Sequence, residues 1–246
     1  MEGAIRLSIV ILLNIISIAT ILFTIYLFTV VHSVIDYILV LLFAILVVIS
    51  TFFNTYSSTW YYKSYKYEKL FDDKFAHLKP IRPFPTVAVA MPIYNEEPSM
   101  VERNVRELTK MKYPKSKIRF YMLDDSTDAK KVEEFRRIAK ENNFFYIHRG
   151  ERKGYKAGAL NNMLSYSKEE YIAIFDSDER LANKNFLIDT LPFMIEDKSV
   201  AYVQTEKRFD KGTFFSDSID IFEAFFFKFV QAGRALNNTT IFAGSC

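Results

Sequence analysis

The chain has 246 residues, of which 50% are hydrophobic and 16% are aromatic. That composition excludes a disordered segment, because a chain this apolar can bury a large core. The formal net charge of +3 is too small to indicate a nucleic-acid partner. The single cysteine, Cys246, excludes an internal disulfide framework.

Two charge-free apolar stretches stand near the N-terminus, at about residues 7–31 and 37–59. Each is longer than the roughly 20 residues that a bilayer-spanning helix needs, and neither shows the polar face of a soluble helix. The link at residues 32–36 is short. Residues 1–59 are therefore predicted to form two transmembrane helices in a hairpin, which places the protein in the cell membrane as a multi-pass protein with the lipid bilayer as a partner.

Basic residues follow the second apolar stretch but do not occur in the link. They are Lys63, Lys66, Lys69, Lys74, Lys79 and Arg82. The positive-inside rule places such residues in the cytosol, together with everything that follows the hairpin. Aromatic residues are interleaved with the lysines, so residues 60–85 are expected to form an interfacial segment that ends in a proline-rich linker.

From residue 86 onward, short apolar runs alternate with stretches of helical pattern. Strands are predicted at residues 86–91, 118–123, 144–148, 171–175 and 200–204, and helices at 99–111, 129–142, 156–165 and 185–196. This order is typical of βαβ units and predicts an α/β fold with a mostly parallel sheet. Ligands bind such sheets at the carboxyl ends of the strands.

Side chains able to do chemistry follow four of the predicted strands. They are Pro92, Tyr94 and Glu96, then Asp124 and Asp125, then Lys156 and Gly158, and finally Asp176 and Asp178. Taken singly, each also fits an ordinary turn, cap or solvated residue. Four such endings on one rim of a sheet indicate a shared site.

Asp176 and Asp178 are separated by one residue at the end of an apolar run. Side chains alternate along extended chain, so the two carboxylates face the same way. Carboxylate oxygens are the ligands that Mg²⁺ and Mn²⁺ prefer. The pair therefore predicts a divalent metal site, with a solvated turn as the plainer interpretation.

The remaining rim residues favour a nucleotide sugar as the ligand. The Tyr94 ring can lie against a base, and Asp124 can accept a hydrogen bond from a base N–H. Lys156 can balance the charge of a diphosphate, and Gly158 permits close backbone approach. Neither a P-loop nor a Rossmann glycine motif occurs in the sequence.

Five short motifs occur in the order found in one known family. They are Pro92-Ile93-Tyr94-Asn95-Glu96, Asp124-Asp125-Ser126, Lys156-Ala157-Gly158, Asp176-Ser177-Asp178 and Val203-Gln204-Thr205. The chain resembles inverting family-2 glycosyltransferases, and within them the cellulose synthase and hyaluronan synthase group. The resemblance implies a cytosolic GT-A domain over residues 86–246. It further implies transfer of a sugar from a nucleoside-diphosphate sugar, with uridine as the expected base, to a polysaccharide or glycolipid acceptor.

The resemblance also assigns residues to the two sides of the reaction. It implies nucleotide contacts from Tyr94, Glu96, Asp124 and Lys156, and we expect Pro92, Asp125, Gly158 and Asp176 in the same donor site, with Asp176 and Asp178 on the metal. On the acceptor side it implies Gln204, Gln231, Gly244 and Ser245. Gln231 belongs to a phenylalanine-rich helix expected at residues 214–235, which fits either ordinary core or the membrane interface.

Two motifs of that family do not occur in the sequence. The family's Ser/Thr-Glu-Asp motif supplies the catalytic base, and its Gln-x-x-Arg-Trp motif holds the acceptor, whereas the only tryptophan here is Trp60. We expect the base to lie beyond Cys246, the GT-A domain to be incomplete at its C-terminus, and this chain to bind the donor with little or no transfer. Alternatives are a non-catalytic donor-binding or regulatory subunit of a complete synthase, or a nucleotidyltransferase, against which the hairpin argues.

Overall fold

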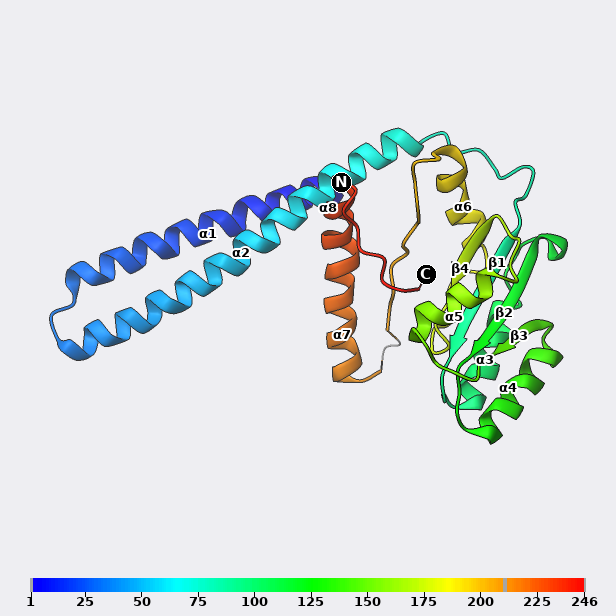
Figure 1. Ribbon diagram of the computed structural model, residues 1–246. Helices are drawn as coiled ribbons and strands as arrows, with labels where there is room; N and C mark the ends of the chain where they lie inside the picture. Colours follow the sequence, from blue (N-terminus) through cyan, green and yellow to red (C-terminus); the bar gives the residue numbers. More distant parts are fainter. Residues whose placement is uncertain (1, 210–211, 246) are drawn as a thin grey trace. The chain divides into compact units, whose positions relative to one another are not determined.

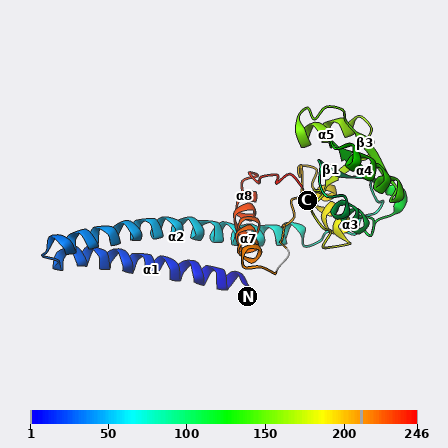
Figure 2. The ribbon, with the colours of Figure 1, turned by 90° about the horizontal axis from the view of Figure 1, so that it is seen from below.

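The computed structural model describes residues 2–209 and 212–245, and the chain divides into two compact units. The helical unit comprises residues 1–76 and 206–241, and the sheet unit comprises residues 77–205 and 242–246. Both are drawn in Figures 1 and 2. The last residues of the chain therefore belong to the sheet unit, whereas the phenylalanine-rich segment before them belongs to the helical unit.

The helical unit contains two long antiparallel helices, α1 (Glu2–Val30) and α2 (Val34–Phe75), which lie side by side in both ribbon views (Figures 1 and 2). Both are long and apolar enough to cross a membrane. Most of their apolar side chains are exposed in the isolated chain, whereas the core helix of a soluble protein would bury its own. Asn54 joins the two helices by donating to the Leu13 carbonyl over 2.8 Å.

Helix α2 runs without a break through residue 59, where the second apolar stretch ends. The segment expected at the membrane interface is thus, as far as Phe75, a continuation of the same helix. The Ser33 hydroxyl caps its N-terminus by accepting a hydrogen bond from the Asp36 N–H over 3.1 Å. The proline-rich linker follows beyond the helix.

The predicted helix at residues 214–235 is confirmed as a continuous helical segment of three parts. They are α7 (Phe214–Phe225), a π-helical turn η2 (Phe226–Gln231) and α8 (Ala232–Ala235). A capping box between Thr213 and Ser216 begins it. The segment packs on α2, where the Tyr61 ring contacts Phe225 and Phe229 at centroid distances of 5.9 and 4.3 Å.

The sheet unit is built on four parallel strands in the order β3-β2-β1-β4, which confirms the predicted parallel sheet. The strands are β1 (Val87–Ile93), β2 (Ile118–Asp124), β3 (Phe144–His148) and β4 (Tyr171–Ile174). The prediction of a fifth strand at residues 200–204 is wrong. Its backbone joins no strand in the described part of the chain, and its Gln204 side chain bonds instead to residues 243–245.

Helices cover both faces of this sheet. On one face lie α3 (Pro98–Leu108), α4 (Ala129–Glu141) and α6 (Phe186–Glu196), and on the other lies α5 (Tyr155–Leu164); a short 3₁₀ turn, η1 (Lys115–Lys117), precedes β2. Side chains of β1 alternate between the two faces. Val89 and Met91 face the core shared with α3, α4 and α6, whereas Ala88 and Ala90 face α5. The small alanines allow α5 to approach closely.

Candidate active site

A pocket of about 470 Å³ opens at the carboxyl ends of the strands. Of the residues predicted for the donor and metal sites, it is lined by Pro92, Tyr94, Glu96, Asp125, Lys156, Asp176 and Asp178. The parallel register explains this convergence, because Ile93 at the end of β1 pairs with Asp124 at the end of β2, and Ala90 pairs with Ile174 of β4. Asp124 and Gly158, also predicted for the donor site, do not line it.

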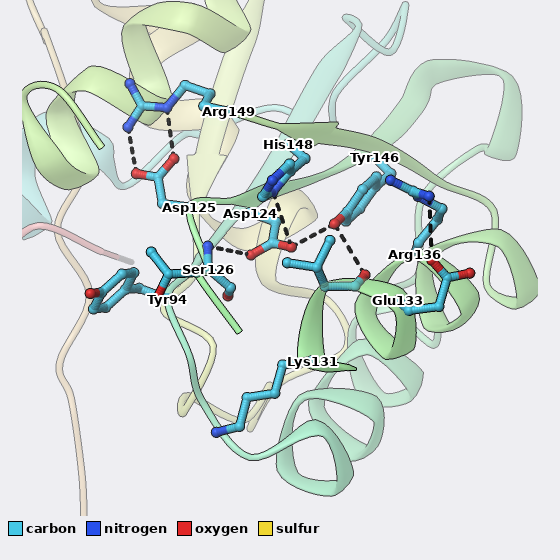
Figure 3. A network of polar contacts seen from close by, with 12 residues as sticks. Tyr94, Asp124, Asp125, Ser126, Lys131, Glu133, Arg136, Tyr146, His148 and Arg149 are labelled. Atoms are coloured by element: carbon cyan, nitrogen blue, oxygen red, sulfur yellow. Dashed lines mark hydrogen bonds and ion pairs between the residues drawn. The ribbon is translucent and has the colours of Figure 1, made fainter. Parts of the chain in front are cut away.

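Asp124 lies beneath the pocket and is fully buried (Figure 3). Its Oδ1 accepts from the Ser126 N–H over 2.8 Å, and its Oδ2 accepts from the Tyr146 hydroxyl over 2.5 Å. Burial, and then the hydrogen bond to this carboxylate, raises the pKa of Tyr146. Both carboxylate oxygens are thus engaged within the protein, so Asp124 fixes the loop after β2.

Asp125, the next residue, turns towards the pocket and is paired with Arg149 (Figure 3). The guanidinium forks onto the carboxylate, with Nε donating to Oδ1 over 2.7 Å and Nη2 donating to Oδ2. Arg149 also donates to the carbonyls of Lys153 and Tyr155, each over 3.1 Å. One arginine therefore ties Asp125 to the loop that leads into α5, and the carboxylate raises its pKa.

Asn95 connects the loops that follow β1 and β2. Its backbone has a φ of 57°, a left-handed conformation that asparagine tolerates better than most residues. Its N–H donates to the Ser126 hydroxyl over 2.8 Å, and its side-chain oxygen accepts from the Thr127 N–H over 3.0 Å. These bonds hold Tyr94 at the mouth of the pocket, where the Glu96 carboxylate accepts from the Tyr94 N–H.

Arg152 is a pocket residue that the sequence analysis missed. Its guanidinium lies 3.4 Å from the centroid of the Tyr94 ring and 5.0 Å from that of Tyr155. This is cation–π contact on the face where a base is expected. The available signal was its position in the segment 149–158, between two glycines and next to two lysines and Arg149.

Gly158 allows the segment at residues 149–158 to fold tightly. A side-chain carbon at this position would lie 2.0 Å from the Lys153 carbonyl oxygen, closer than atoms can pack. Gly154, in the left-handed conformation with a φ of 74°, precedes α5. The predicted close backbone approach is therefore made to the chain's own carbonyl, and it sets Lys156 in the first turn of α5.

Asp176 is the centre of a second polar network. Lys156 forms an ion pair with its Oδ1, and the Ser245 hydroxyl lies 3.0 Å from its Oδ2 and 2.8 Å from Glu179 Oε1. Gln204 holds this C-terminal segment, since its amide donates to the Ser245 carbonyl over 2.9 Å and accepts from the Ala243 N–H over 2.9 Å.

The predicted acceptor-side residues divide between the two units. The Ser245 hydroxyl lies beside Asp176, Gln204 holds the backbone of Ser245, and Gly244 lies close to the Lys156 ammonium. Gln231 lies in the helical unit, where it is buried and its amide bonds to both backbone groups of Ile241.

The oxygen donors of the pocket suit a hard divalent cation. Asp176 and Asp178 supply carboxylates there, Asp178 being exposed. Within residues 2–209 and 212–245, no three acidic, histidine or cysteine side chains gather as a metal cage. Mg²⁺ is commonly held by one or two carboxylates that are completed by phosphate oxygens, so this donor set fits a metal that arrives with a phosphate ligand.

The family model described as "Glycosyl transferase family 2" matches residues 88–246, a region that includes every residue of this pocket. The chain belongs to this glycosyltransferase family. Its sheet, together with that match, is the GT-A type predicted from the motifs.

Similarity to named glycosyltransferases extends over the same region. The chain is 35% identical over 169 residues to "Cellulose synthase catalytic subunit [UDP-forming]" of Pseudomonas fluorescens (strain SBW25), covering 66% of this chain and 22% of that protein. It is 38% identical over 138 residues to "Probable glucomannan 4-beta-mannosyltransferase 7" of Oryza sativa subsp. japonica, covering 53% and 23%. The chain thus spans less than a quarter of the length of either relative.

Among solved structures, the mannosyltransferase PcManGT from Pyrobaculum calidifontis, in complex with GDP-Man and Mn²⁺, is similar with a TM-score of 0.43. It is 20% identical, and the match covers 56% of this chain and 44% of that one.

Proposed function

We propose that the pocket binds a nucleoside-diphosphate sugar, with a UDP-sugar as the first candidate, for inverting transfer to a polysaccharide or glycolipid. One observation carries the proposal: in a family-2 glycosyltransferase domain, an aromatic ring, a lysine and four carboxylates line one pocket at the strand ends. The cellulose synthase and mannosyltransferase relatives support a polysaccharide as the product.

The base lies against Tyr94 and meets Asp125 in place of Asp124, because Asp125 is the one of the two that lines the pocket. Arg152 covers the same ring and either moves aside or stacks on the base from the other face. Lys156, which forms an ion pair with Asp176, neutralises the diphosphate.

Asp176 and Asp178 would hold Mg²⁺ or Mn²⁺ on the diphosphate. Such a metal, when bound, stabilises the negative charge that develops on a leaving nucleoside diphosphate. Asp176 already accepts from Lys156 and lies 3.0 Å from the Ser245 hydroxyl, so its position is fixed before the donor enters. Ser245, Gly244 and Gln204 then border the acceptor side of the sugar.

The hairpin of α1 and α2 anchors this domain to a membrane, with the domain on the cytosolic side. The exposed apolar length of both helices supports the anchor, and the lysines that follow the second stretch support the orientation.

The test is isothermal titration of the full 246-residue chain in detergent with UDP and GDP, with and without Mn²⁺. Asp178→Asn should weaken Mn²⁺-dependent binding by about tenfold or more, as for loss of a charged ligand. Asp72→Asn, an exposed aspartate of α2, is the matched control and should bind like the wild type.

Full affinity of Asp178→Asn in Mn²⁺ would remove the metal assignment, and absence of nucleotide binding by the wild type would overturn the proposed function. Sugar transfer is measured on the same samples with radiolabelled donors. Transfer by this chain would exclude the non-catalytic donor-binding subunit.

A further inference from the structure

A second pocket, of about 490 Å³, lies in the helical unit, far along the sequence from the residues that line the donor pocket. Three segments build it: the first half of α1, the middle of α2 and the residues that follow α8. Asn14 of α1 reaches across to α2, where its amide donates to the Ser58 hydroxyl over 3.3 Å. The pocket is thus formed by the tertiary fold of the helical unit.

The approach of α8 to α2 depends on Gly233. A side-chain carbon at this position would lie 2.8 Å from the Trp60 ring and 2.9 Å from the Lys63 Cβ, so only glycine allows the contact. This contact brings Leu236 and Asn237 to the wall of the pocket. Figure 1 shows α8 beside α2 at this point.

The pocket is polar and carries positive charge. Lys63 and Lys66 lie three residues apart on one face of α2, and the hydroxyls of Thr55, Ser58 and Thr59 continue that lining. Among the described lining residues there is no carboxylate. Neither lysine has an ion-pair partner in the part of the chain that the structure describes, and Lys63 has only the Trp60 ring, 4.9 Å from its ammonium. Two ammonium groups with no carboxylate beside them match an anionic phosphate ester.

The position of the pocket along the hairpin favours a lipid headgroup as the phosphate ester. The charge-free stretch of α2 ends at Thr59, and Lys63 is the first charged residue beyond it. In the proposed membrane hairpin, on which this step rests, the pocket therefore stands at the level of the lipid headgroups, with the apolar helices below it for the acyl chains.

We propose that this pocket binds the headgroup of an anionic phospholipid. The lysines compensate the phosphate, and Thr55 and Tyr62 offer hydroxyls to it or to a polar headgroup substituent. A zwitterionic headgroup is disfavoured, because its own cation meets the same lysines. Bound lipid would also contact Leu236 and Asn237 in the wall of the pocket and so stabilise the turn after α8.

The test is native mass spectrometry of the full chain in detergent, titrated with dioctanoyl phosphatidylglycerol, dioctanoyl phosphatidylcholine or inorganic phosphate. Lys63→Gln and Lys66→Gln should each weaken phosphatidylglycerol binding by about fivefold, the effect expected of one lysine at an anionic lipid surface. Lys69→Gln is the matched control: an exposed lysine of the same helix that does not line the pocket, and it should bind like the wild type.

Equal losses in Lys66→Gln and Lys69→Gln would overturn the proposal, because attraction to the whole basic surface would then explain the binding. Inorganic phosphate that binds as tightly as the lipid would overturn the assignment to a headgroup. UDP titration of the same variants keeps the two proposals distinct, since neither lysine belongs to the donor pocket. Retention of the chain in carbonate-washed membranes tests the hairpin separately.

Discussion

The Ser245 hydroxyl lies 3.0 Å from the Oδ2 of Asp176, although the two residues are separated by 69 positions in sequence. Ser245 is fully buried, and its carbonyl is held by Gln204. The other oxygen of Asp176 is paired with Lys156. Each oxygen of the carboxylate proposed for the metal therefore has a polar side chain of the protein beside it.

Ser245→Ala should tighten Mn²⁺ binding in the presence of UDP, because the hydroxyl no longer stands beside the Asp176 oxygen that the metal would take. A net hydrogen bond of about 1 kcal/mol corresponds to roughly fivefold in affinity. Ser199→Ala is the control, since that hydroxyl donates to Asp197, which is not a pocket residue. Weaker binding by Ser245→Ala, measured by Mn²⁺ titration at saturating UDP, would show instead that Ser245 orients the carboxylate for the metal.

Lys156→Met should weaken UDP binding by about tenfold or more, as for loss of a charge-assisted contact. Uridine, which has no phosphate, should bind as it does to the wild type. Lys153→Met serves as control, because that exposed side chain does not line the pocket. Titration of each variant with both ligands separates a diphosphate contact from a loss of fold, and equal losses for the two ligands would remove the proposed role.

The sequence predicted which strand ends come together, but not which side chains at those ends line the pocket. Strands β1, β2 and β4 are marked by apolar runs, and their parallel register brings their ends together. Asp124 and Asp125 look alike in a sequence, yet Asp124 is the last residue of β2 and Asp125 lies beyond it. Neighbouring side chains face opposite ways at a strand end. Both aspartates are buried, but only Asp125 lines the pocket.

Two other differences have local physical causes. The run at residues 200–204 has the composition of a strand, but pairing requires a neighbouring edge that sequence alone does not reveal. Arg152 was missed because an arginine in a basic loop is most simply solvated, and only the fold places it 3.4 Å from the Tyr94 ring. In both cases the structure depends on contacts between residues far apart in sequence, which local patterns do not reveal.

Gly158→Ala should destabilise the sheet unit, because the added carbon would lie 2.0 Å from the Lys153 carbonyl. Overpacking of this kind costs roughly 1–3 kcal/mol or more, and it displaces the turn that carries Lys156. Gly150→Ala is the matched control, since nothing lies within 4 Å of a carbon added there. Thermal unfolding and UDP titration should show loss of both stability and affinity in Gly158→Ala alone; a Tm equal to that of Gly150→Ala would contradict the packing.

Tyr113 should give the stability of the sheet unit a dependence on alkaline pH. Its hydroxyl donates to the Pro85 carbonyl over 2.8 Å, and burial, followed by the nearby Glu170 and Tyr171, raises its pKa to about 12. An unfolded tyrosine loses its proton near pH 10. Between about pH 10 and pH 12 the folded chain therefore holds a proton that the unfolded chain has released.

That difference fixes the direction of the effect. The stability that Tyr113 contributes is complete below about pH 10 and is lost as the pH rises towards 12, with a slope of up to about 1.4 kcal/mol per pH unit. Tyr113→Phe should be less stable than the wild type at pH 8, because the buried Pro85 carbonyl loses its donor, and should decline less steeply from pH 9 to 11. Urea unfolding across that range measures both, with the exposed Tyr166→Phe as control. An alkaline slope that stays the same in Tyr113→Phe would mean that other groups carry it, Tyr121 and Tyr146 among them, since their pKa values are also raised by burial.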